Sequence, residues 1–104
     1  MFRATTPVHK FVFDKDPDQF KEILITYAQN GRIIVEKRKE DLSFEPADND
    51  CYQTSVKLTQ AEANRFRAGE VNIQIRVLTL GGDALACEIK TISVKDVLND
   101  EVLK

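Results

Sequence analysis

The chain has no tryptophan, one histidine and two cysteines among its 104 residues. His9 therefore lacks a histidine partner for a zinc or iron site, and there is no Cys-x-x-Cys motif. Cys51 and Cys87 fall within predicted strands, where they could pair, but we expect reduced thiols that pack in the core. Without tryptophan, and with both tyrosines in predicted strands, sugar binding is disfavoured. We expect neither a bound metal nor another cofactor.

A large charge imbalance and long apolar runs are also missing. The net charge of −2 lacks the basic surplus of a nucleic-acid binder and the strong acidity of a DNA mimic. No stretch approaches the roughly 20 apolar residues of a membrane span, and the opening MFRATTPVHK does not read as a secretory signal. With 42% apolar and 31% charged residues, the sequence predicts one globular domain over residues 1–104, with 95–104 as a possible C-terminal arm.

Complete catalytic and metal-binding motifs are absent as well. Asp14, Asp16 and Asp18 have the opening spacing of an EF-hand calcium loop, but Gln19 replaces the required glycine and Ile25 the final glutamate. We interpret this segment as a solvated acidic turn. Because no serine lies in a nucleophile-elbow sequence, we expect a protein without enzymatic activity.

The clearest local signal is a helix start in the middle of the chain. Thr59 and Glu62 form a capping box, in which each side chain accepts a hydrogen bond from the other residue's amide. Gly69 can supply a left-handed exit. The pattern predicts a two-turn helix over residues 60–66, with Phe66 packed in the core.

Alternating apolar residues predict strands in much of the remaining chain. In the longest strand Val71, Ile73, Ile75 and Val77 face one side, and polar residues face the other. Turn residues recur at regular spacing between short strands. The predicted fold is all-β, an antiparallel seven-stranded immunoglobulin-like (Ig-like) β-sandwich with one short capped helix. The predicted strands are 8–13, 21–28, 32–39, 42–44, 52–58, 71–80 and 84–94.

The loop at residues 29–31 sets the register of the first predicted hairpin. A two-residue Asn-Gly loop would place Glu36 opposite Ile25. A three-residue loop, with its glycine in the left-handed conformation, pairs Tyr27 with Ile33 and buries like against like. We predict the three-residue loop.

The loop at residues 81–83 gives the second predicted hairpin, again with three loop residues. This register sets Val77 against Cys87. The apolar phase of the last strand shifts towards its end, which predicts a bulge near Thr91.

The outer face of the long strand changes from polar to apolar towards this second hairpin. In the predicted register two alanines lie opposite two leucines, so an apolar patch spans both strands and needs a cover. The chain's own tail could fold back as that cover, but we favour an arm that docks on an adjacent copy or another protein. The predicted partner-binding residues are Leu78, Leu80, Ala84 and Ala86 on the patch, and Val97, Leu98, Val102 and Leu103 on the tail.

The stretch LTQAEANRFRAGEVNIQIRVLTLGGDALA, residues 58–86, resembles small β-sandwich proteins encoded by phages and prophages of Gram-positive bacteria. In these proteins a strand ends in Leu-Thr, a capped turn carries glutamate, and a glycine leads into a glutamine-rich strand and a hairpin. TYAQNGRIIVEKRKEDLSF at 26–44 is similar to their first half, and VLNDEVL at 97–103 to their tails. The resemblance covers about Thr6 to Leu103. It implies a phage-particle or prophage context and no catalytic residues.

Two functions fit these observations. The first is a structural or adaptor protein of a phage particle, in the tail, baseplate or head–tail region, which contacts its own copies or other particle proteins. Such a protein would be present in the bacterial host cytoplasm during assembly and then in the particle. The alternative is an intracellular inhibitor that binds a host protein such as a defence enzyme. Neither function needs nucleic acid, a membrane or a small-molecule substrate.

Overall fold

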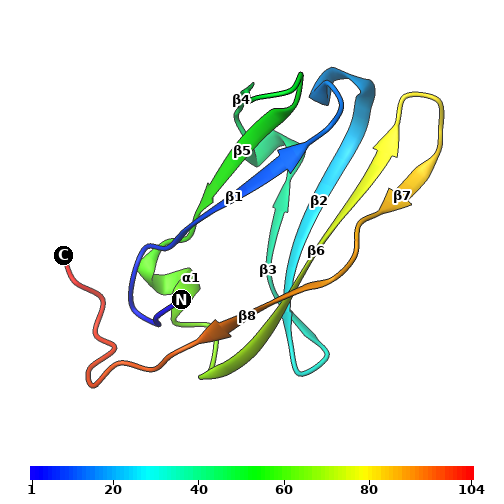
Figure 1. Ribbon diagram of the computed structural model, residues 1–104. Helices are drawn as coiled ribbons and strands as arrows, with labels where there is room; N and C mark the ends of the chain where they lie inside the picture. Colours follow the sequence, from blue (N-terminus) through cyan, green and yellow to red (C-terminus); the bar gives the residue numbers. More distant parts are fainter.

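The computed structural model describes residues 1–104 as two antiparallel β-sheets that pack face to face (Figure 1). The predicted all-β, two-sheet architecture with one short α-helix is confirmed, and the Ig-like strand arrangement stays a prediction. The smaller sheet has the order β1-β5-β4, with β1 (Val8–Phe13), β5 (Tyr52–Lys57) and β4 (Phe44–Pro46). The larger sheet contains β3 (Arg32–Arg38), β2 (Phe20–Gln29), β6 (Gly69–Thr79), β7 (Ala84–Ala86) and β8 (Lys90–Val94), in the order β3-β2-β6, with β7 and β8 both paired to β6.

The core lies between the inward faces of the two sheets. Side chains alternate along β2, so Ile23, Ile25 and Tyr27 are buried while their neighbours are more exposed. Burying each such side chain contributes roughly 1.5–3 kcal/mol relative to leaving it in water. The buried apolar cluster consists of Phe13, Phe20, Ile23, Ile25, Tyr27, Val35, Val56, Leu58, Phe66, Val71, Ile73 and Val94.

The first hairpin has a two-residue loop, so the predicted three-residue loop is wrong. Asn30 and Gly31 both have left-handed φ angles, +53° and +76°, as a type I′ turn requires. A register shift within β3 then places Val35, rather than Ile33, opposite Tyr27. Because of this shift two buried side chains, Tyr27 and Val35, lie opposite each other, a pairing that neither of the two registers considered from the sequence contains.

The second hairpin has the predicted loop length but a different position. Its loop is residues 80–82, because Gly82, with φ +90°, occupies the third position, where the left-handed conformation falls. The Thr79 amide donates a hydrogen bond to the Asp83 carbonyl at 2.9 Å, which closes the loop. Val77 therefore lies opposite Leu85, and the predicted pairing with Cys87 is wrong.

The predicted last strand, 84–94, is broken into β7 and β8, which gives eight strands rather than seven. Cys87 bonds to Ile75 of β6, and Lys90 lies opposite Ile73. The two residues between them, 88 and 89, therefore face the single residue Gln74. A bulge is present, but it precedes the predicted site at Thr91, which pairs regularly. Because of the bulge, Lys90, Ile92 and Val94 lie opposite the inward-facing positions of β6.

The predicted helix is present but shorter, since α1 spans Gln60–Ala63. Its capping box is formed as predicted: the Glu62 amide donates to Thr59 Oγ1, and the Thr59 amide donates to Glu62 Oε1, both at 3.0 Å. The amide of Phe66 bonds only three residues back, which tightens the turn and ends the helix early. No helix of the structure is long and apolar enough to span a bilayer.

Gln29 holds the segment after this helix in place. Its side chain is 5% exposed, and its Nε2 donates to the Arg67 carbonyl at 2.7 Å. Its Oε1 accepts from the Arg67 amide at 2.8 Å. The end of β2 is thereby joined to the loop that leads into β6, and the left-handed Gly69 lies at the start of that strand rather than at the helix end.

Thr59→Ala should lower the free energy of unfolding by about 1 kcal/mol, because the amide of Glu62 loses its acceptor. For a domain of this size, the melting temperature should fall by about 4–8 °C. Thermal unfolding followed by circular dichroism measures this change. Thr59→Ser keeps the hydroxyl and serves as the control; equal melting temperatures for Thr59→Ala and the wild type would contradict the cap.

Candidate functional site

One side of the sandwich is closed and the other is open. On the closed side, the 3₁₀ turn η2 (Lys39–Asp41) crosses from β3 to β4, and Lys39 Nζ donates to the Phe20 carbonyl at 2.7 Å. On the open side, β1 pairs only with β5, and β7 and β8 pair only with β6. Two strand edges from different sheets therefore face each other without a strand between them (Figure 1).

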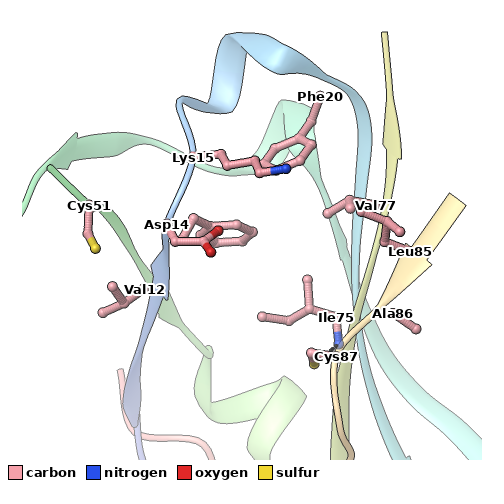
Figure 2. Close-up of a pocket in the computed structure, with 11 residues that line it drawn as sticks. Val12, Asp14, Lys15, Phe20, Cys51, Ile75, Val77, Leu85, Ala86 and Cys87 are labelled. Atoms are coloured by element: carbon pink, nitrogen blue, oxygen red, sulfur yellow. Dashed lines mark hydrogen bonds between the residues drawn. The ribbon is translucent and has the colours of Figure 1, made fainter. Parts of the chain in front are cut away.

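A continuous cleft runs between these two edges. It has two parts with volumes of about 520 Å³ and 510 Å³, which share Val12, Ile75 and Cys87. Figure 2 shows Val12 and Asp14 on one wall, with Ile75 and Val77 on the other. We call it the edge cleft; its residues are Val8, His9, Lys10, Phe11, Val12, Phe13, Asp14, Lys15, Phe20, Cys51, Ile73, Ile75, Val77, Leu85, Ala86, Cys87, Lys90 and Ile92.

The edge cleft exposes apolar side chains that ordinarily lie in a core. Ile73 is only 5% exposed, but Ile75 and Val77, on the same face of β6, are half-buried because the smaller sheet does not cover them. At the rim, Val12 is 63% exposed and Leu85 49% exposed. A contiguous apolar surface of this kind, bordered by charged residues, is typical of a site that binds another molecule.

His9 lies in the cleft and connects it to the core. Its Nδ1 is 2.7 Å from the hydroxyl of Tyr27, a residue with no exposed surface. Partial burial lowers the pKa of His9, and the positive N-terminus adds to this effect. Burial of the phenol, with a smaller contribution from the charge of Glu62, raises the pKa of Tyr27. The pair is neutral at neutral pH and joins the two sheets.

Both cysteines lie in the edge cleft, from opposite walls (Figure 2). Both thiols are free, but neither packs in the core as we expected, because Cys51 is half-buried and Cys87 is exposed at the strand edges. Cys87 Sγ accepts from the Ile75 amide at 3.2 Å and can donate to the Glu88 carbonyl at 3.2 Å. His9 is bonded to Tyr27, so the geometry does not pair a thiol with an imidazole.

The acidic segment near the cleft is a turn. Asp16 Oδ1 accepts from the Asp18 amide at 2.9 Å and caps the 3₁₀ turn η1 (Pro17–Gln19). Asp16 Oδ2 also accepts from the Tyr52 hydroxyl at 3.4 Å. No group of three or more histidine, cysteine, aspartate or glutamate residues is placed to hold a metal ion. The carboxylate of Asp16 thus organises the connection between β1 and β2.

The four predicted patch residues do not form the continuous patch expected from the sequence. Because the register differs, Leu78 lies opposite Ala84, and Ala86 lies opposite the charged Arg76. Leu80 is in the loop and is 70% exposed. Ala86 borders the edge cleft, where it lies beside β7's Leu85 rather than in an outer apolar patch.

The four predicted tail residues lie at the other end of the molecule, beside α1 and the N-terminus (Figure 1). The backbone of Leu103 exchanges two hydrogen bonds with the Gln60 side chain, at 2.8 and 2.9 Å. Leu98 is fully exposed, Leu103 is 73% exposed and Val102 is 41% exposed, whereas Val97 is half-buried. The structure therefore does not bring the tail against the patch.

Sequence reasoning missed the rim residues of the edge cleft. Val12 was overlooked because the alternation in β1 assigns Phe11 and Phe13 to the core and leaves Val12 on the other face. The predicted register of the second hairpin sets Leu85 opposite Thr79, on the same face of the strand, whereas the structure sets it opposite Val77 at the cleft. The available signal was that Val8 and Val12 are apolar on the outward face of a strand next to lysines.

The fold should lose stability as the pH falls from about 7 to about 5.5. In the unfolded chain His9 binds a proton near its ordinary pKa of 6.5, whereas in the folded chain its pKa is lower. The unfolded state therefore gains protons first, and the free energy of unfolding decreases with falling pH. Urea unfolding at several pH values should show this slope in the wild type and a smaller one in His9→Gln. Equal slopes would contradict the assignment, since His9 is the only histidine.

Comparison with protein-family models found no match to this chain. Comparison with curated proteins and with solved structures also found no match. What the chain does must therefore be inferred from the geometry of the edge cleft and from the sequence motifs.

Proposed function

We propose that this chain is a non-enzymatic structural or adaptor protein of a phage particle, in its tail, baseplate or head–tail region, and that it binds another protein through the edge cleft. The observation that carries the proposal is the pair of unpaired strand edges, β1 and β7–β8, on either side of an apolar cleft. This arrangement supports a binding function more than a chemical one, because the polar side chains in the cleft are few and His9 is already bonded to Tyr27.

The cleft has the features that an extended peptide needs in order to bind. An edge strand presents unpaired amides and carbonyls, which can form a ladder with an added strand. Apolar side chains such as Val12, Ile75 and Leu85 provide pockets for alternate side chains of that strand. A protein segment fits this combination better than a small molecule does, because the cleft is long and open at its sides.

The phage context comes from the sequence resemblance over about Thr6 to Leu103. The capped turn at Thr59 and the hairpin after Thr79, which carry much of that resemblance, are both formed in the structure. In this proposal the chain is present in the bacterial host cytoplasm during assembly and then in the phage particle. A free inhibitor of a host protein would use the same cleft but would stay outside the particle.

Mass spectrometry of purified particles tests the proposal. The wild-type chain should be a stoichiometric component of particles from a strain that encodes it. A cleft variant, Val12→Lys with Leu85→Lys, should be incorporated about tenfold less, because two apolar contacts are lost from the interface. Both residues are largely exposed, so the variant should fold.

Ile33→Lys is the matched control, because Ile33 is 62% exposed on β3 and lies outside the edge cleft. It should be incorporated as well as the wild type. Recovery of the wild-type chain only in the soluble fraction of infected cells, bound to a host protein, would contradict the particle function and favour the inhibitor.

A further inference from the structure

The charged residues along the two edges of the cleft limit which protein segments can bind there. Lys10 lies in β1, Lys15 follows it, and Lys90 begins β8, so lysines border both walls. Asp14 is the one acidic residue among the lining side chains. Lysine on an edge strand disfavours pairing of that edge with the same edge of another copy. The cleft therefore favours an acidic segment that also carries apolar side chains.

The chain contains such a segment, residues 96–103, with the sequence DVLNDEVL. It has three carboxylates and no basic side chain, together with Val97, Leu98, Val102 and Leu103. Eight consecutive residues of one wall, Val8–Lys15, line the cleft. Eight extended residues span about 26 Å, so the segment matches the cleft in length as well as in charge.

In its own copy this segment is held largely by polar contacts, among them two hydrogen bonds between Gln60 and the Leu103 backbone and one from Asn64 Nδ2 to the Asp100 carbonyl. Arg3 donates to Asp96 at 2.9 Å and to Asp100 at 3.1 Å, and both carboxylates are more than half exposed. Exposed ion pairs of this kind contribute little to stability. The apolar side chain of Leu98 contributes no buried surface to this contact, because it is fully exposed.

The path from the segment into the cleft of its own copy is occupied. Phe2 forms a parallel bridge with Lys95, immediately before the segment. The Lys95 amide donates to the Met1 carbonyl at 2.7 Å, and the Arg3 amide donates to the Lys95 carbonyl at 3.0 Å. The N-terminal residues thus cover the edge next to the end of β8 and direct the tail away from the cleft.

We propose that residues 96–103 of a second copy of this chain dock as an added strand in the edge cleft. This inference rests on the proposed function and names the partner of the same site. In an extended segment Leu98, Asp100 and Val102 point to one side. Leu98 and Val102 contact the apolar walls, and the carboxylate of Asp100 between them meets Lys10 or Lys90.

Sedimentation velocity over a range of concentrations tests the proposal with the full chain. A tail variant, Leu98→Lys with Val102→Lys, and the cleft variant, Val12→Lys with Leu85→Lys, should each weaken self-association about 100-fold, because apolar contacts are lost and lysines face lysines. Ile33→Lys should associate like the wild type. An equimolar mixture of the tail and cleft variants should form a one-to-one dimer, because one intact tail and one intact cleft remain in the mixture.

Three results would overturn the inference. A mixture that stays monomeric would show that tail and cleft are not partners. A wild type that is monomeric at every concentration, with melting temperatures lowered in both variants, would show that the tail fills its own cleft. Normal self-association of the tail variant, together with loss of particle incorporation in the cleft variant, would leave the proposed function standing and reject the tail as the occupant.

Discussion

Burial of the Tyr27 hydroxyl constrains the whole sandwich. A phenol with no exposed surface needs a hydrogen-bond partner, since an unpaired buried polar group costs about 1–3 kcal/mol. His9 provides that partner from the other sheet, at 2.7 Å, which fixes β1 over β2. Phe66 packs against the same tyrosine, with ring centroids 6.1 Å apart, and so brings the segment after α1 to this point. Two sheets and the helical connection meet at one side chain.

This anchoring explains why the sandwich is filled at one end and open at the other. Near α1, Val71 and Ile73 are buried by residues from both sheets. Further along β6, Ile75 and Val77 face the same way but are covered by less, because no strand lies between β1 and β7. The edge cleft is therefore the continuation of the core beyond the point where the second layer ends, and its apolar lining follows from the ordinary alternation of a strand.

The sequence predicted the structure correctly where the interacting residues are close together in the chain. Thr59 and Glu62 satisfy each other locally, so their capping box was predictable and is present. Hairpin registers depend instead on which loop residue takes a left-handed φ, and Gly82 resolved this in favour of a loop shifted by one residue. That shift changes the residue opposite Leu85 from Thr79 to Val77, on the same face of β6. The candidate site was missed because two strand edges that are far apart in sequence create it.

The position of the C-terminal segment gives the molecule a direction. The folded molecule is 47 Å long, and this segment leaves beside α1 (Figure 1). The cleft extends towards the β6–β7 hairpin, where Val77 and Leu85 line it. A contact between unlike surfaces on successive copies is heterologous, so every copy in an assembly points the same way. The rotation between neighbours then decides the outcome: a rotation that closes gives a ring of fixed copy number, and one that does not close gives a filament. If the proposed contact forms, small changes in how the segment is seated would determine the size of the assembly rather than its strength.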